Sequence, residues 1–407
     1  MNIKRIALII GFILFVLGMG TLLYFAFFRT SPPPSTTPPD TQTPSVTPEF
    51  PTPGVFVPPS TTPPPPSELP VGERPPAPSI TQANGATVQT IEVQHDRNIA
   101  IAPLGVTGDA VITFDSFEQK FYRITPEGTQ EELSDQKFPG ATDISFTPTA
   151  DKAIIEFYDG SNILYNFTTK QQVTLPKHWR EFSFGPNGNQ IAFKSLTGDA
   201  DNNWLGLAND DGSAGRQVEP LGIKGGLVNV SWSPSDQIIA TFREGVDGFH
   251  QKIYFLGKNG ENFPAMTVNG RDFQNKWSPQ GDRMIYSVYS PESDLKPELW
   301  VVDALGDTIG NNRRNLQVNT WVDKCAFASA NMMYCAVPSR MDSGAGVVRS
   351  LSDKEEDYLY RININTGERL KVAQPDGRHT ISNIVITKDN LFFTDKNSGK
   401  LYTIKLQ

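Results

Sequence analysis

The chain has 407 residues, of which 38% are hydrophobic, and its formal net charge is −8 at pH 7. Nucleic-acid binding needs a basic face that neutralises phosphates, and the sequence has no Lys/Arg cluster with interleaved aromatic residues. The acidic balance therefore excludes a nucleic-acid partner.

The N-terminal segment predicts a membrane anchor. Residues 1–5 are polar and carry Lys4 and Arg5, and residues 6–28 are 23 residues without a charge. That length suits a helix crossing a hydrocarbon core of about 30 Å, whereas a cleaved signal peptide, the alternative, has a shorter apolar core. Because positive charges stay in the cytoplasm, we expect a single-pass protein of the cell membrane. Residues 1–5 would be cytoplasmic, residues 6–28 would form a transmembrane signal-anchor helix, and the rest would be extracytoplasmic.

Residues 29–80 have the composition of a linker. Residues 31–80 contain 19 Pro and 14 Ser or Thr. Such a chain cannot bury a core and favours extended polyproline II. We expect a disordered Pro-rich stalk that holds the following domain away from the membrane. Ligands for proline-recognising domains are the alternative, but they would lie on the wrong side of the membrane.

A repeated pattern organises the rest of the chain. A strand ends in an aromatic residue, a turn with Pro and Gly or a small polar residue follows, and a second apolar strand begins. Pro lacks an N–H and suits strand ends and turns, and Gly permits the reversal. The copies read NVSWSPSDQIIATF from Asn229, DISFTPTADKAIIEF from Asp143, EFSFGPNGNQIAF from Glu181 and QNKWSPQGDRMIY from Gln274, with weaker copies from Asp323 and Ser382.

A second strand-and-turn motif follows each first one, as in KIYFLGKNG from Lys252 and ELWVVDALG from Glu298. A period of roughly 40–50 residues with four short strands per unit is typical of β-propeller blades. We predict an all-β, seven-bladed propeller over residues 86–407, with six or eight blades as alternatives. The predicted blades are 98–134, 142–176, 180–219, 227–269, 272–318, 322–373 and 381–406.

The last predicted blade contains only three strands, and a closed ring must hide its sheet edges. Residues 86–94, ATVQTIEVQ, form a strand-like run before the first blade. We therefore predict that Thr87–Val93 is the outer strand of the last blade and pairs beside Lys400–Leu406.

These motifs resemble a known family. SWSPSDQIIATF and KWSPQGDRMIYS, followed by IYFLGKNG and LWVVDALG, look like the repeats of TolB-like, WD-repeat-like (PD repeat) β-propellers. The propeller domain of the dipeptidyl peptidase IV type is also similar. The resemblance covers most of residues 95–407 and implies a propeller scaffold without a hydrolase domain, and propellers serve many functions.

No pattern indicates a catalytic site. The nearest match to a G-x-S-x-G nucleophile elbow is Asp211-Gly212-Ser213-Ala214-Gly215, which has Asp in place of the first Gly and lies in a predicted hairpin turn. The histidines lack a partner at metal-ligand spacing, and loop histidines explain them. We therefore predict a protein that is not an enzyme.

One segment suits a cation. Asp199, Asp201 and Asn203 stand at alternate positions, and oxygen ligands of this kind bind Ca²⁺. Trp204 replaces the glycine that an EF-hand loop requires, so a solvated acidic hairpin tip is the preferred interpretation. We expect no other cofactor.

Cys325 and Cys335 are the two cysteines of the chain. They lie on consecutive strands of one predicted hairpin, equidistant from Ala330. Directly opposed residues of antiparallel strands come close enough for a disulfide, and an extracytoplasmic location lets one persist. Two small buried residues in blade packing are the alternative.

Long connections between the second and third strands of a blade are predicted at 195–203, 244–251, 290–297 and 339–357. Up-and-down connectivity places them on one face of the ring, and loops on a rigid scaffold often carry binding residues. The longest connection, 339–357, predicts either a recognition loop or a mobile insertion. Its candidate ligand-binding residues are Arg340, Val347, Val348, Arg349, Leu351 and Asp353.

The sequence thus predicts a membrane-anchored, extracytoplasmic propeller that acts as a non-catalytic binding or scaffold module. Its partner would be a protein or an envelope polymer, and it would contact the membrane through residues 6–28. The alternative is a peptide- or glycan-processing enzyme with its site at the mouth of the propeller channel.

Overall fold

A computed structural model describes residues 12, 15–19, 21–22, 81–105 and 108–406. The chain divides into two compact units, Met1–Val71 and Gly72–Gln407. Among the described residues, no helix is long and apolar enough to span a membrane. The predicted transmembrane helix lies largely, and the predicted stalk wholly, outside the described residues, so both stay predictions.

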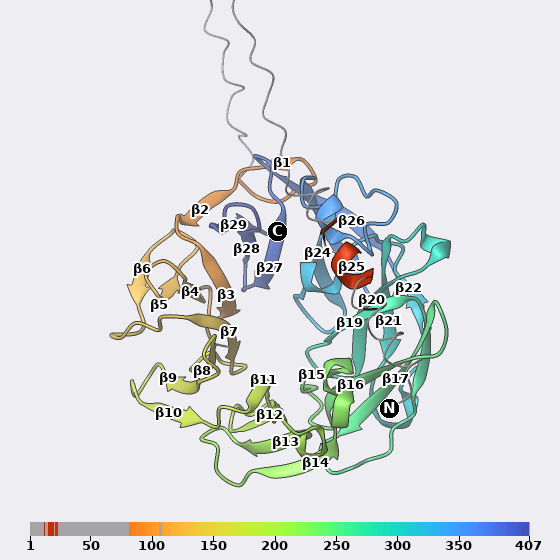
Figure 1. The fold of residues 1–407 in the computed structure, drawn as a ribbon. Helices are drawn as coiled ribbons and strands as arrows, with labels where there is room; N and C mark the ends of the chain where they lie inside the picture. The colour runs from red at the N-terminus through yellow and green to blue at the C-terminus, as the bar shows by residue number, and fades with distance from the viewer. Residues whose placement is uncertain (1–11, 13–14, 20, 23–80, 106–107, 407) are drawn as a thin grey trace, which may run out of the picture. The chain divides into compact units, whose positions relative to one another are not determined.

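Seven β-sheets form a ring, in agreement with the predicted all-β, seven-bladed propeller (Figure 1). Each blade has four antiparallel strands, which are consecutive in all blades but the last, and the last takes its fourth strand from the N-terminal end of the domain. The sixth blade has a fifth, parallel strand at its edge, β1 (Thr87–Val88). The first strand of each blade faces the centre of the ring (Figure 1).

Blade 1 holds β3 (Asn98–Pro103), β4 (Val111–Asp115), β5 (Lys120–Ile124) and β6 (Gln130–Glu132). Blade 2 holds β7 (Ala141–Phe146), β8 (Lys152–Phe157), β9 (Asn162–Asn166) and β10 (Gln172–Leu175). Blade 3 holds β11 (Trp179–Phe184), β12 (Gln190–Ser195), β13 (Trp204–Asn209) and β14 (Arg216–Pro220). Blade 4 holds β15 (Val228–Val230), β16 (Ile238–Gly245), β17 (His250–Gly257) and β18 (Met266–Asn269).

Blades 5 to 7 continue the ring and carry the longest connections. Blade 5 holds β19 (Arg271–Trp277), β20 (Arg283–Tyr289), β21 (Pro297–Asp303) and β22 (Arg314–Asn315). Blade 6 holds β23 (Cys325–Phe327), β24 (Met332–Pro338), β25 (Asp357–Asn363) and β26 (Arg369–Pro375). Blade 7 holds β27 (Ile381–Ile386), β28 (Asn390–Asp395), β29 (Leu401–Lys405) and β2 (Ile91–Gln94). Short 3₁₀ turns lie between strands: η1 (Ala200–Asn202), η2 (Gly222–Leu227), η3 (Pro291–Ser293), η4 (Gly306–Thr308), η5 (Val322–Lys324) and η6 (Arg349–Leu351).

The ring is closed by β2, which pairs antiparallel with β29, with Ile91 opposite Thr403. In Figure 1 the orange β2 lies beside the blue β29. The predicted strand Thr87–Val93 is wrong in its first half, because β1 (Thr87–Val88) joins blade 6 and runs parallel to β26. The reason is a turn between the two strands, where the amide of Thr90 donates to Asp376 Oδ1 at 2.6 Å.

The repeated turn has a side-chain basis that links its first and last residues. Ser278 Oγ donates to Asp282 Oδ1 at 2.7 Å, and Thr147 Oγ1 donates to Asp151 Oδ1 at 2.6 Å. Gly281 has φ +69°, and a Cβ there would lie 2.4 Å from the amide nitrogen of Ser235 in blade 4. The repeated motif therefore fixes the conformation of the turn, and its glycine also lets turns of adjacent blades pack closely.

The core lies between the blades, where the aromatic residues that end the first strands pack. Trp277 of blade 5 donates through Nε1 to Ser231 Oγ of blade 4 at 2.9 Å. Trp232 of blade 4 packs on Gly185 of blade 3, where a Cβ would lie 3.3 Å from the indole. Each fully buried large apolar side chain contributes about 1.5–3 kcal/mol, so these contacts join neighbouring blades into one ring.

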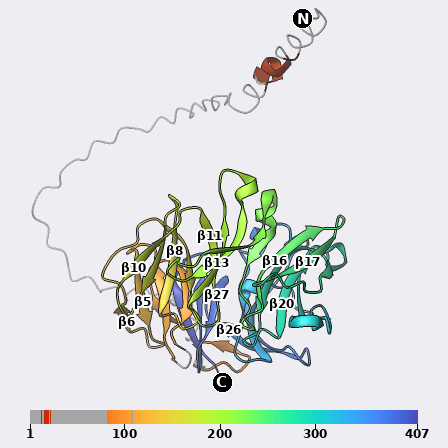
Figure 2. The same ribbon diagram turned by 90° about the horizontal axis from the view of Figure 1, so that it is seen from below.

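Up-and-down connectivity separates the connections into two faces. The connections between the second and third strands of each blade, and those between successive blades, lie on one side, which we call the loop face. Figure 2 shows green connections of blades 3 and 4 rising from this face, with the C-terminus on the opposite side of the ring.

Candidate functional site

The longest connection of the loop face joins β24 to β25 and covers residues 339–356. It is ordered by contacts with blade 5. The amide of Gly346 donates to Leu295 O at 2.8 Å, and Ser343 Oγ donates to Asp294 Oδ1 at 2.8 Å. Ala345 is fully buried between these contacts. One side of the connection is therefore held by the preceding blade.

The other side of the connection is held by blade 7. Lys396 Nζ donates to both carboxylate oxygens of Asp353, at 2.7 and 2.8 Å, and Thr380 Oγ1 donates to Asp353 O at 2.9 Å. Asp353 was predicted to bind a ligand, but its carboxylate already has this partner. The connection is thus held by contacts on both sides, and we call residues 339–356 the platform. Whether it acts as a recognition loop stays a prediction.

Two predicted binding residues of this connection are arginines with carboxylate partners. Arg340 pairs with Asp342 at 3.1 Å on the surface. Arg349 pairs with Asp323 at 2.6 Å and lies over the ring of Trp321, 4.6 Å from its centroid. Arg349 thus connects the platform to the blade 5–6 junction.

The three apolar candidates point outward from the platform. Val347 is 55% exposed, Val348 48% and Leu351 43%. Exposed apolar side chains on an ordered connection cost solvation free energy without stabilising the fold. These three residues are therefore the predicted candidates with no structural role within the described chain.

A buried ion pair lies beneath the platform. Lys324 Nζ contacts Asp357 Oδ2 at 2.6 Å, and Asp357 Oδ2 also accepts from the amide of Ile381 at 2.6 Å. Burial lowers the pKa of Lys324 and raises the pKa of Asp357. The pair joins blade 6 to blade 7 where the platform is attached.

Exposed large apolar residues gather on the loop face. Among the connections in the described part of the chain, one residue of this kind, Leu305, lies on the opposite face. Those of the loop face are Phe117, Tyr158, Ile223, Leu227, Val246, Phe249, Val347, Val348 and Leu351. Singly exposed apolar residues are normal on protein surfaces, whereas exposed apolar residues that lie together mark interaction surfaces. On the loop face this applies to Val347, Val348 and Leu351, which lie within five positions of one connection.

The central channel opens on the same face as a cavity of about 630 Å³. Charged residues of both signs line it: Glu181, Lys194, Arg243, Asp272, Lys276 and Asp323. Lys194 Nζ contacts Glu181 at 2.6 Å, and Arg243 lies 3.9 Å from Asp272. The mouth of the channel is therefore polar, whereas the surrounding connections carry the exposed apolar residues named above.

Sequence analysis missed three residues that line the channel, Glu181, Asp272 and Asn383, because β-bulges turn them inward. Glu181, Asp272 and Asn383 have φ of 54°, 54° and 48°, and each lies at a bulge in the first strand of its blade. Non-glycine residues rarely adopt positive φ, and a bulge re-aims a side chain. The available signal is weak: in each copy a carboxylate or amide residue precedes Phe or Ile.

The proposed calcium ligands are engaged in turn hydrogen bonds. Asp199 accepts from the amide of Asp201 at 3.1 Å and from Asn202 Nδ2 at 2.9 Å. Asn203 Nδ2 donates to Gly222 O at 3.0 Å. In the part of the chain that the structure describes, no group of three or more His, Cys, Asp or Glu residues is arranged to hold a metal. A calcium ion here stays a prediction.

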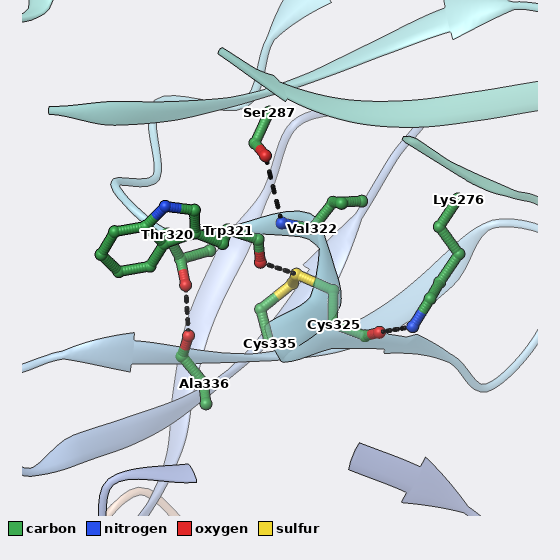
Figure 3. The surroundings of a disulfide bond; sticks show 8 residues. All are labelled: Lys276, Ser287, Thr320, Trp321, Val322, Cys325, Cys335 and Ala336. Atoms are coloured by element: carbon green, nitrogen blue, oxygen red, sulfur yellow. Dashed lines mark hydrogen bonds between the residues drawn. A yellow bond between two sulfur atoms is a disulfide. The ribbon is translucent and has the colours of Figure 1, made fainter. Parts of the chain in front are cut away.

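Cys325 and Cys335 lie directly opposite each other in β23 and β24 and are joined in a disulfide (Figure 3). Both residues are fully buried, and Lys276 Nζ of blade 5 donates to Cys325 O at 2.6 Å. Thr320 Oγ1 donates to Ala336 O at 2.6 Å beside the disulfide (Figure 3). The cysteines occupy a junction between blades 5 and 6.

Three of the histidines contact carboxylates, which sequence analysis did not identify. His95 contacts Glu92, His250 Nδ1 lies 2.8 Å from Asp247, and His379 Nδ1 lies 3.2 Å from Asp395. Within the described residues, the ring of His379 has no hydrogen bond to a serine or cysteine side chain that could act as a nucleophile. The buried His379–Asp395 pair instead orders the turn after β28.

No protein-family model matches the sequence, and no curated protein matches it. Solved structures with a similar fold are β-propellers. An oligogalacturonate lyase in complex with manganese is 12% identical, with a TM-score of 0.52, over 78% of this chain and 93% of that chain. The β-propeller domain of Cps50 (Swd1) from Myceliophteria thermophila is 10% identical, with a TM-score of 0.52, over 78% and 100%. The tricorn protease is 11% identical, with a TM-score of 0.50, over 78% and 34%.

At these identities the likeness shows the β-propeller fold alone. It does not single out the TolB-like family or the dipeptidyl peptidase IV type. Because the similar structures include enzymes, the fold does not decide between a catalytic and a non-catalytic role.

Proposed function

We propose that this chain is a non-catalytic binding module that recognises a protein partner through the loop face of its propeller. The observation that carries the proposal is the gathering of exposed apolar residues on that face. Apolar side chains surrounded by polar ones mark protein interaction sites, whereas a polar polymer would be recognised mainly through hydrogen bonds.

The platform 339–356 supports this proposal. Its contacts with Leu295 of blade 5 and Lys396 of blade 7 hold Val347, Val348 and Leu351 in place before any partner arrives. A preordered surface loses little conformational entropy on binding, so more of the contact free energy contributes to affinity.

We further propose that residues 6–28 anchor the protein in the cell membrane and that the propeller is extracytoplasmic. The propeller's own geometry is compatible with such an anchor. Gln82 and Ala83, where the described domain begins, contact Lys405 and Leu406, at the end of β29 away from the loop face. The first described residues of the domain therefore lie at the end of the blades opposite the loop face.

The test measures which proteins are captured by three forms of the full chain, each extracted in mild detergent, and how tightly they bind. The first is the natural chain, and the second carries Val347→Ser, Val348→Ser and Leu351→Ser. The third is a matched control with Val173→Ser, Leu305→Ser and Leu370→Ser, which changes residues of 37%, 39% and 50% exposure outside the loop face.

We expect one protein to be captured by the natural chain and by the control, and its affinity for the platform variant to fall about 100-fold or more. Central interface residues each contribute upwards of 1 kcal/mol, and three of them suffice for this loss. Equal capture by all three forms would contradict the proposal, and capture of a polysaccharide in place of a protein would replace it with polymer binding.

A further inference from the structure

The mouth of the channel contains hydrogen-bond donors that the fold leaves unused. It is formed by residues of several blades, with Arg243 on β16, Asn275 and Lys276 on β19, and Asp323 at the blade 5–6 junction. Glu181 and Asp323 already have cationic partners, Lys194 and Arg349, each at 2.6 Å. The donors of Lys276, Asn275 and Arg243 are less fully used.

Lys276 has the least compensated charge. Its ammonium group has three donors, and one of them is used, toward Cys325 O at 2.6 Å. No carboxylate in the described chain lies within 4.0 Å of Nζ, and burial lowers the pKa of Lys276. The charge of Asp323 raises this pKa, but burial outweighs it, and Asp323 is itself paired with Arg349. A bound anion would offset the remaining cost of burying the ammonium group.

Asn275 and Arg243 add donors on the side of the mouth nearer blade 4. Asn275 Nδ2 is buried and has no hydrogen-bond partner among the described residues. Arg243 makes one long hydrogen bond, from Nη1 to Phe273 O at 3.4 Å, and lies 3.9 Å from Asp272. A buried polar group without a partner is rare in folded proteins and points to a missing ligand or water.

We propose that the channel mouth is a binding site for a carboxylate, held by Lys276 and Asn275 with Arg243 as a third donor. A carboxylate accepts several hydrogen bonds at once, which suits donors converging from neighbouring strands. One negative charge balances the Lys276 ammonium, which has no direct ion pair in the described chain. A dianion such as phosphate would bring a second negative charge close to Glu181, Asp272 and Asp323, which line the same cavity.

The carboxylate can belong to a free organic acid or to a peptide, and small probes distinguish these sources. The full chain is titrated with acetate, with N-acetyl-glutamate α-amide and with acetyl-Gly-Gly, which has a free C-terminus. Each probe has a neutral amide counterpart: acetamide, N-acetyl-glutamine amide and acetyl-Gly-Gly amide. Binding is followed through the NMR signal of the Asn275 side-chain amide.

We expect at least one carboxylate to bind saturably and its amide counterpart not to bind. Binding of acetate identifies a site for free acids, and binding of one peptide probe alone identifies an acidic side chain or a C-terminus. Lys276→Met should weaken binding about tenfold or more, because hydrogen bonds to charged groups contribute more than neutral ones. Lys276→Arg should restore most of the affinity.

Lys388→Met is the matched control, because Lys388 is exposed on the face opposite the mouth, and it should bind like the natural chain. If Lys276→Met fails to fold, Arg243→Gln provides the same comparison, keeps the Asn275 amide signal and should weaken binding several-fold. Absence of saturable binding, equal binding of acids and amides, or unchanged binding by a folded Lys276→Met chain would overturn the proposal. These titrations use no protein partner, so their result is independent of the proposed loop-face function.

Discussion

At the scale of single residues, Asp395 shows how a buried carboxylate organises a turn. It accepts from the amides of Asn397 at 3.0 Å and Ser398 at 2.8 Å, and from the amide of Thr380 at 3.2 Å. Burial raises the pKa of Asp395, but hydrogen bonds from His379 and Ser398 outweigh burial and hold this pKa below its ordinary value. The ionised form is therefore the one that the fold stabilises.

This predicts a stability difference that depends on pH. The pKa of Asp395 is lower in the folded than in the unfolded chain. Its contribution to the free energy of unfolding is therefore fully present above the unfolded pKa of about 3.9 and is lost as pH falls through the folded pKa. Asp395→Asn should lower the free energy of unfolding by about 1–3 kcal/mol at pH 7. This difference between the natural chain and the variant should become smaller at pH 3. Urea unfolding of the natural chain, Asp395→Asn and the exposed control Asp389→Asn measures this. If the difference in unfolding free energy is the same or larger at pH 3, the ionised form of Asp395 is not what stabilises the fold.

Residue-scale prediction from sequence worked where spacing alone decides geometry. Cys325 and Cys335 are equidistant from Ala330, and the structure pairs them directly. It failed at Glu181, Asp272 and Asn383, because a bulge shifts the strict alternation of a strand by one residue. A regular pattern therefore assigns these side chains to the wrong face, and the channel mouth stays hidden from sequence analysis.

At the scale of elements, the position of the platform 339–356 could be predicted from the sequence, but the contacts that order it could not. Its position between the second and third strands of blade 6 followed from the repeat. Its rigidity did not, because the contacts that order it come from blades 5 and 7 and depend on the small size of Gly346. A Cβ on Gly346 would lie 2.5 Å from Tyr289 Cβ and 2.7 Å from Leu295 O.

Gly346→Ala should therefore release the platform from blade 5 without unfolding the ring. Overpacking costs about 1–3 kcal/mol, which corresponds to roughly 5- to 150-fold faster exchange of amides protected by local structure. Hydrogen exchange at Val347 and Val348, whose amides donate to Gly344 O at 3.0 Å, reports the effect. Gly248→Ala is the control, since a Cβ there meets no atom within 4 Å. Unchanged exchange in Gly346→Ala would show that the platform is not held by this contact.

At the scale of the whole molecule, ring closure could be anticipated by counting strands, since the last repeat lacked one. The division of the closing segment between two blades could not. The turn at Thr90 depends on Asp376, nearly 300 residues later in the chain, and no local pattern encodes such a contact. The same holds for the channel, whose lining residues are far apart in sequence.

Replacing residues 87–94 by a Gly/Ser segment of equal length should open the ring. The replacement removes Val88 and Val93, which are 0% and 5% exposed, and this costs about 3–6 kcal/mol. It also exposes the edge of β29, which promotes association. Thermal unfolding and light scattering of the full chain measure both effects, and an equal Gly/Ser replacement of residues 40–47 is the control. An unchanged melting temperature would show that β2 does not close the ring.

The segment before β2 also determines how the propeller responds to a mechanical pull on its N-terminal side. Ala83 N donates to Lys405 O in blade 7, Gly85 N donates to Val372 O in blade 6, and Gln374 N donates to Ala86 O. Asp376 N then donates to Val88 O before the chain turns at Thr90. A pull from the N-terminal side therefore meets the hydrogen bonds to blades 6 and 7 before it reaches β2. The strand that closes the ring is thus not the first point of attachment of the preceding chain.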